Sequence, residues 1–129
     1  MASESRRRFL SLCCVLFVLA LATATQMTAQ QPRDVRDRAI ADFEAGRVAE
    51  AAAGFDAVFD ASPVLAPQLW QRGIALYYAG RYVECRQQFE SHRLVNPADV
   101  ENATWHFLCV ARMDGPEVAL AALLPVGRD

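Results

Sequence analysis

The residues that could do chemistry in this chain are few. Its only two histidines are His92 and His106, and neither has a metal ligand or a nucleophile at a useful spacing. The sequence contains no glycine-rich phosphate loop, no paired-carboxylate constellation and no Ser/His/Asp set. We therefore expect a protein that is not an enzyme and that has no catalytic residues, no metal site and no cofactor.

Two cysteines, Cys85 and Cys109, lie outside the apolar N-terminal run that contains Cys13 and Cys14. In an oxidising compartment Cys85 and Cys109 could form a disulfide, provided that the helices carrying them pack together. The alternative is that Cys85 is only a small residue of the core. Because the pairing of cysteines cannot be deduced from a sequence, we favour this alternative.

An internal repeat predicts the elements that position these residues. When the chain is aligned with itself at an offset of 34 residues, identical residues coincide at turn and core positions. Among the coincident pairs are Gly46 with Gly80, Arg47 with Arg81, Glu50 with Glu84, Phe55 with Phe89, and Pro63 with Pro97. Each unit is interpreted as a helix, a turn at glycine, a second helix and a proline stop. The predicted helices cover residues 34–45 and 48–61, then 67–79 and 82–95.

These units resemble the tetratricopeptide repeat (TPR), whose pattern has a small residue in the first helix, Ala-x3-Phe in the second, and a closing proline. Ala51, Phe55 and Pro63 match that pattern. The second unit matches through Gly73, Phe89 and Pro97, with Cys85 in place of alanine. The resemblance implies an all-α fold, a short right-handed superhelical solenoid of antiparallel helix pairs. Its domain would cover residues 32–129.

Within that domain, two full units span residues 32–65 and 66–99, and a degenerate third unit spans residues 100–129. Trp105 and Gly115 each follow their second-unit counterparts by 35 residues, which indicates one inserted residue. Helices are predicted over 103–113 and 116–124. Because a polar capping helix is absent, we expect either that more protein follows or that a partner covers this end.

The TPR resemblance also implies a binding surface, because the first helices of such repeats line a concave groove that binds peptides. Carried over by position, the partner-binding residues would be Arg36, Ile40, Phe43, Trp70, Ile74, Tyr77, Tyr78, Trp105 and Arg112. Aromatic residues and arginine concentrate binding energy at interfaces. For Trp70 and Trp105 we favour packing between stacked helices, whereas for Tyr77 and Tyr78 we favour the groove.

The N-terminal residues 1–24 are predicted to be a signal peptide, followed by a short linker over residues 25–31. Arg6, Arg7 and Arg8 precede an uncharged apolar run from Phe9 to Ala22, which is shorter than the roughly 20 residues that span a bilayer. Ser5 to Leu10 also resembles the twin-arginine signal pattern. We therefore expect export to the periplasm or outside the cell. The alternative is a membrane-anchored protein in which this helix stays uncleaved.

Charge narrows the range of partners. The net charge is −2, and all thirteen basic residues are arginine. The chain therefore lacks the excess of positive charge with which proteins attract nucleic acid. We expect a non-catalytic scaffold or adaptor that binds a protein or peptide partner after export, with membrane contact only through an uncleaved signal. The alternatives are a structural, self-associating homo-oligomer and an accessory domain of a larger protein.

Overall fold

A computed structural model describes residues 33–127, and every regular element in that range is a helix, as the sequence predicts. The predicted signal peptide (1–24) and linker (25–31) lie outside the described residues. The described residues from Val35 onward belong to one compact unit. Within residues 33–127, every helix is too short or too polar to cross a bilayer.

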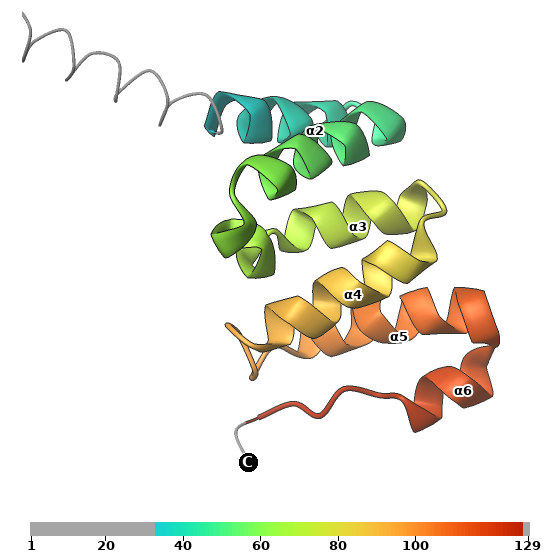
Figure 1. The fold of residues 1–129 in the computed structure, drawn as a ribbon. Helices are drawn as coiled ribbons and strands as arrows, with labels where there is room; N and C mark the ends of the chain where they lie inside the picture. The colour runs from blue at the N-terminus through green and yellow to red at the C-terminus, as the bar shows by residue number, and fades with distance from the viewer. Residues whose placement is uncertain (1–32, 128–129) are drawn as a thin grey trace, which may run out of the picture. The chain divides into compact units, whose positions relative to one another are not determined.

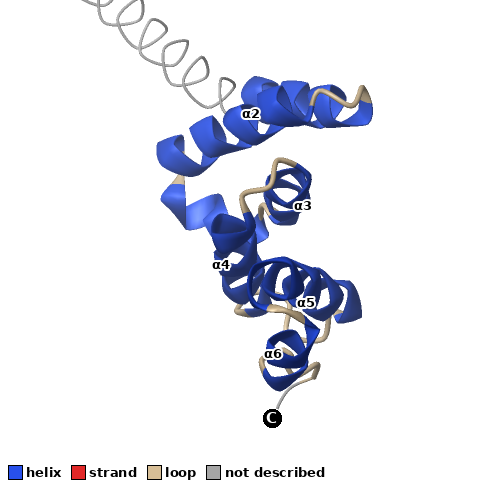
Figure 2. Cartoon of the chain, turned by 90° about the vertical axis from the view of Figure 1, so that its right-hand side faces the viewer, coloured by secondary structure: helices blue, strands red, loops and turns tan. Residues whose placement is uncertain are grey.

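The elements are a helix whose described part covers residues 33–44, α2 (Val48–Ala61), η1 (Pro63–Gln68), α3 (Trp70–Tyr78), α4 (Tyr82–Arg93), α5 (Val100–Asp114) and α6 (Pro116–Ala121). The α-helices follow one another in chain order, each packed on the next (Figure 1). In Figure 2, α3 and α5 lie on one side of the stack, and the 3-10 helix η1 lies on the other.

The two glycine turns have the same geometry, 34 residues apart. Gly46 and Gly80 have φ angles of +73° and +75°, which glycine adopts without the penalty of a Cβ atom. The amide of Gly46 donates to the carbonyl of Phe43, and the next amide, that of Arg47, donates to the carbonyl of Asp42. Gly80 and Arg81 repeat this pair of bonds, which closes a Schellman motif at the end of each helix.

Small residues let the paired helices approach closely. A Cβ atom on Gly54 of α2 would lie 2.8 Å from the Cβ atom of Ala39. A Cβ atom on Gly73 of α3 would lie 2.6 Å from the ring of Phe89 on α4. Phe55 and Phe89, the repeated phenylalanines, are both fully buried in the core. The first helix and α2 therefore approach closely at Ala39 and Gly54, and α3 and α4 approach closely at Gly73 and Phe89.

A disulfide joins Cys85 of α4 to Cys109 of α5, with the two Cα atoms 6.0 Å apart. Both residues are completely buried in the core. The interpretation of Cys85 as only a small core residue is therefore incomplete, because Cys85 is a core residue and a disulfide partner at once. The packing of α4 on α5 brings the two sulfur atoms together, and this packing leaves no signal in the sequence.

A buried polar network holds η1, α2, α3 and α4 together. Arg72 of α3 is almost fully buried, and its Nε atom donates to Oδ1 of Asp56 on α2 at 2.8 Å. Its guanidinium also donates to Gln88 of α4 at 3.1 Å and lies over the ring of Phe59, 4.4 Å from the ring centroid. Gln88 in turn donates to the carbonyl of Ala66 at 2.7 Å. Each polar group of this network thereby gains a partner in place of water.

The helix α3 begins at Trp70, three residues later than Pro67, where the sequence predicts its start. The reason is tertiary. The carbonyls of Ala66 and Pro67, which lie at the start of the predicted helix, accept from the side chains of Gln88 and His92 on α4, and the carbonyl of Ala66 also accepts from the amide of Leu69 in the 3-10 pattern. Residues 63–68 consequently form the tighter η1, in which Pro63 and Pro67 are tolerated.

The third unit also differs from its predicted bounds. The helix α5 begins at Val100 instead of Ala103, because the carboxylate of Asp99 accepts from the amides of Glu101 and Asn102 and caps the helix. The helix α6 ends at Ala121, earlier than the predicted residue 124. The following residues turn back, and the amide of Gly127 donates to the carbonyl of Pro97 at 3.0 Å.

Candidate functional site

Aromatic rings from four helices touch one another on one side of the molecule. We call Phe43, Tyr77, Tyr78, Tyr82 and Trp105 the aromatic band. Tyr77 lies 5.6 Å from both Tyr82 and Trp105 between ring centroids, and Tyr78 lies 6.0 Å from Phe43 and 6.2 Å from Trp105. Most of these pairs meet edge to face, a favourable arrangement for aromatic rings. The band therefore links the first helix, α3, α4 and α5.

The members of the band differ in exposure. Tyr78 is 60% exposed, whereas Tyr77 and Trp105 are partly buried and pack against the core. The indole of Trp105 also stacks on Phe89, with an angle of 12° between the two planes. The ring of Tyr78 is thus accessible at the surface, while Tyr77 and Trp105 pack between that surface and the core.

Trp70 occupies a different position from the one we favoured. At the start of α3 it is 44% exposed and is not enclosed between stacked helices. It lines two cavities of similar size, which we call the apolar cavity and the acidic cavity. The apolar cavity has a volume of about 290 Å³ and is lined by Trp70 and by Ile40, Phe43, Glu44, Phe55, Gln71 and Ile74.

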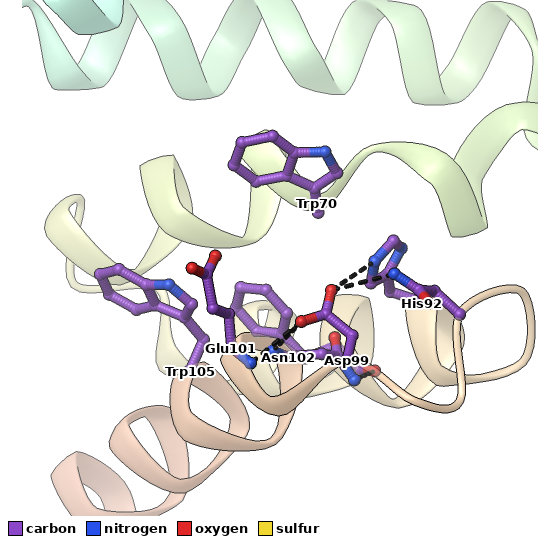
Figure 3. A pocket seen from close by; sticks show the side chains of 8 residues that line it. Trp70, His92, Asp99, Glu101, Asn102 and Trp105 are labelled. Atoms are coloured by element: carbon purple, nitrogen blue, oxygen red, sulfur yellow. Dashed lines mark hydrogen bonds and ion pairs between the residues drawn. The ribbon is translucent and has the colours of Figure 1, made fainter. Parts of the chain in front are cut away.

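The acidic cavity lies on the other flank of Trp70 and has a volume of about 270 Å³ (Figure 3). Two indoles, those of Trp70 and Trp105, form part of its wall together with the ring of Phe89. The rest of the lining is polar and comes from the end of α4, the following loop and the start of α5. These polar residues are His92, Asn96, Asp99, Glu101 and Asn102.

Hydrogen bonds hold the polar lining in place. Asp99 caps α5 and also accepts from the amide group of Asn96 at 3.1 Å. The Nδ1 atom of His92 donates to the carbonyl of Pro67 at 2.7 Å, while its Nε2 atom lies 3.5 Å from Asp99. The side chain of Asn102 donates to the carbonyl of Phe89 at 3.1 Å. The cavity therefore has a preorganised polar wall.

Glu101 is the exception in that wall. It is exposed, and its carboxylate forms no hydrogen bond or ion pair with any residue between 33 and 127. Figure 3 shows the carboxylate extending away from α5, on the side where the two indoles lie. Glu101 and Trp105 are four residues apart on one helix, which puts their side chains on the same face.

The two predicted arginines lie away from both cavities. Arg36 is exposed and pairs with its neighbour Asp37, 3.4 Å apart. Arg112 donates to the hydroxyl of Tyr82 at 2.8 Å and lies over the ring of that tyrosine. The structure thus brings seven of the nine predicted residues to the two cavities or the band, places Arg112 at the edge of the band, and leaves Arg36 outside.

Sequence reasoning missed the acidic cavity. Its polar residues span 92–102, a stretch for which the sequence predicts only a helix end and a connection. One local signal was available: an aspartate at position 99 is a preferred N-cap. An α5 that starts at Val100 puts Glu101 and Trp105 on one face, whereas a start at Ala103 leaves Glu101 outside the helix.

Two titratable side chains of the described residues have clearly shifted pKa values. Burial lowers the pKa of His106, and the acceptor nearest its ring is Glu90 at 3.5 Å. Hydrogen bonds to Glu84 and Asp56 raise the pKa of the Arg81 guanidinium above its ordinary value. Within residues 33–127, groups of three or more side chains that could hold a metal ion do not occur.

Comparisons with protein-family models, with curated proteins and with solved structures gave no match.

Proposed function

We propose that this chain is a non-catalytic scaffold that binds a protein or peptide partner through the face formed by the first helix, α3 and α5. The observation that carries the proposal is the continuity of that face. The aromatic band joins the three helices, and the two cavities flank the exposed indole of Trp70. Exposed aromatic side chains beside preformed cavities are the usual anchors of protein interfaces.

The repeated geometry supports a TPR-like solenoid as the framework for this surface. The turns at Gly46 and Gly80 share their φ angles and hydrogen bonds, and Phe55 and Phe89 occupy equivalent buried positions. In such a framework the first helices of successive units form the concave face. Trp70 and Tyr78 on α3 would then project from that face toward a partner.

Export is the second part of the proposal. The predicted signal peptide motivates it, and the buried disulfide between Cys85 and Cys109 supports it, because disulfides persist mainly in oxidising compartments. Fractionation of bacterial cells that express the full chain tests this part. Recovery of the oxidised protein outside the cytoplasm is expected, and a reduced cytoplasmic protein would contradict export.

A peptide selection tests binding. A random peptide library is selected against the purified chain, and the enriched peptides are measured against a variant with Trp70→Ala and Tyr78→Ala. Both residues are exposed, so the variant should fold normally, as circular dichroism can verify. The control is Val83→Ala, an exposed residue of α4 outside the band and both cavities. We expect affinity to be lost only in the Trp70/Tyr78 variant. Equal binding to all three proteins would refute the proposed face.

Self-association is a second candidate function, favoured by the apolar side chains at the C-terminal end. Four of them are between 47% and 65% exposed: Val118, Leu120, Leu123 and Val126. Burial of such side chains at about 25 cal/mol per Å² would favour a dimer. Sedimentation over a wide concentration range separates the candidates. A concentration-independent monomer argues against self-association.

A further inference from the structure

The acidic cavity has a chemistry that the rest of the proposed binding face lacks. Its wall combines two indoles with two carboxylates, those of Asp99 and Glu101, and its described lining contains no arginine. The apolar cavity on the other flank of Trp70 has mainly aliphatic and aromatic walls. The two cavities therefore favour different side chains of a partner.

The two carboxylates have different roles. Asp99 already accepts from the amides of Glu101 and Asn102 and from the side chain of Asn96, so its charge is largely compensated. Glu101 has no such compensation from residues 33–127. Its carboxylate is a hydrogen-bond acceptor with two oxygens available to a ligand. The ligand that satisfies it must bring donors and positive charge.

The indoles define the shape of that ligand. A cation over the face of a tryptophan is attracted by the negative potential of the ring, and a guanidinium can also stack on it. A guanidinium additionally offers the paired N–H groups that match a carboxylate. An anionic side chain would be repelled by Glu101 and Asp99, and a purely apolar one would remove Glu101 from water without a partner.

We infer that the acidic cavity binds an arginine side chain of a peptide partner, with the guanidinium between Trp70 and Trp105 and hydrogen-bonded to Glu101. This inference rests on the proposed binding face and names the residue that the face selects. The cavity volume of about 270 Å³ is below the usual range for a whole small-molecule ligand, which suits a single side chain. The peptide chain itself would continue over Trp70 toward the apolar cavity.

The sequence supplies a direct probe of this site. The chain contains two tryptophans, and both line the acidic cavity. In an NMR spectrum of the full chain, the two indole N–H resonances therefore report on this cavity without any label. N-acetyl-arginine amide is titrated in, with the corresponding amides of lysine, leucine and glutamate as comparisons.

We expect the arginine amide to shift both indole resonances, lysine to bind more weakly, and leucine and glutamate to leave the resonances unchanged. Glu101→Gln keeps the size of the side chain and should weaken arginine binding about tenfold. Glu50→Gln is the matched control, because it removes the same charge from an exposed position on α2 outside the cavity. Equal binding to wild type and Glu101→Gln, or a preference for leucine or glutamate, would overturn the inference.

The peptides from the library selection separate this inference from the proposed function. Enriched peptides that contain arginine and bind Glu101→Gln about tenfold more weakly support it. Enriched peptides that lack arginine and bind Glu101→Gln normally overturn it while leaving the binding face intact. If no peptide binds better than the arginine amide alone, the site takes only a free cation, and both the inference and the proposed function fail.

Discussion

The buried network around Asp56 offers the sharpest test of the structure. Asp56→Ala removes the carboxylate that accepts from Arg72 at 2.8 and 2.7 Å and that also contacts Arg81. The side chain of Arg72 is only 9% exposed, so its charge would remain buried with Gln88 and the ring of Phe59 as its partners. Breaking one side of a buried ion pair costs about 3–5 kcal/mol.

We expect a value near the lower end of that range, about 3 kcal/mol, because the side chain of Asp56 is itself 27% exposed and water can reach the site. For a domain of this size, such a loss lowers the melting temperature by roughly 12 °C or more. Urea denaturation followed by circular dichroism measures the free energy of unfolding directly.

Two comparison variants make the test specific. Glu84→Ala removes a carboxylate that pairs with Arg81 at the surface, and exposed pairs contribute less than about 1 kcal/mol. Arg72→Met removes the buried charge and leaves Gln88 without one donor, so we expect a loss of about 1–2 kcal/mol. If Asp56→Ala destabilised the protein no more than Glu84→Ala, the reasoning about the buried arginine would be wrong.

Three further predictions concern the turn, the disulfide and the buried histidine. Gly80→Ala should lower the free energy of unfolding, measured by urea denaturation, by about 1–2 kcal/mol. An added Cβ atom meets nothing within 4 Å, so the loss comes from the φ angle of +75° alone. An unchanged free energy of unfolding would contradict this prediction. Joint replacement of Cys85 and Cys109 by alanine should lower the free energy of unfolding by about 3 kcal/mol, because the disulfide closes a loop with a sequence separation of 24. A variant as stable as the oxidised protein would refute this prediction. Burial lowers the pKa of His106 below 6.5, so below pH 6.5 the unfolded state binds more protons at this residue and stability falls until the folded pKa is reached. In His106→Gln that part of the pH dependence should vanish, and an identical pH profile in both proteins would count against it.

The sequence was most informative where structure depends on neighbours in the chain. The bounds of α2, residues 48–61, were predicted correctly because the glycine turn before it and Ser62-Pro63 after it are local signals. The start of α3 was predicted wrongly because Gln88 and His92, about twenty residues away, occupy the carbonyls of Ala66 and Pro67. Long-range competition of this kind leaves no periodic pattern in a sequence.

The candidate site also combines features that depend on local sequence with features that depend on long-range packing. The spacing of the repeat identified Trp70 and Trp105 as equivalent positions on first helices. The acidic cavity between them also needs the loop before α5, whose path is set by the cap at Asp99 and by the bond from Gly127 to Pro97. The cap at Asp99 could have been predicted from the local sequence. The hydrogen bond from Gly127 to Pro97 could not, because it depends on where the residues after α6 pack.

The disulfide gives the two flanks of the acidic cavity unequal rigidity. Phe89 and His92 belong to α4, and Trp105 belongs to α5, so the covalent bond between Cys85 and Cys109 keeps that flank assembled. The opposite flank is the indole of Trp70 on α3, and packing and hydrogen bonds, not a covalent cross-link, hold η1 and α3 to α4. The side chains on the cross-linked flank would therefore keep their relative positions with the smaller loss of entropy when a ligand binds. Reduction of the disulfide would remove that constraint, so the affinity of this cavity should depend on the redox state of a bond that no ligand touches.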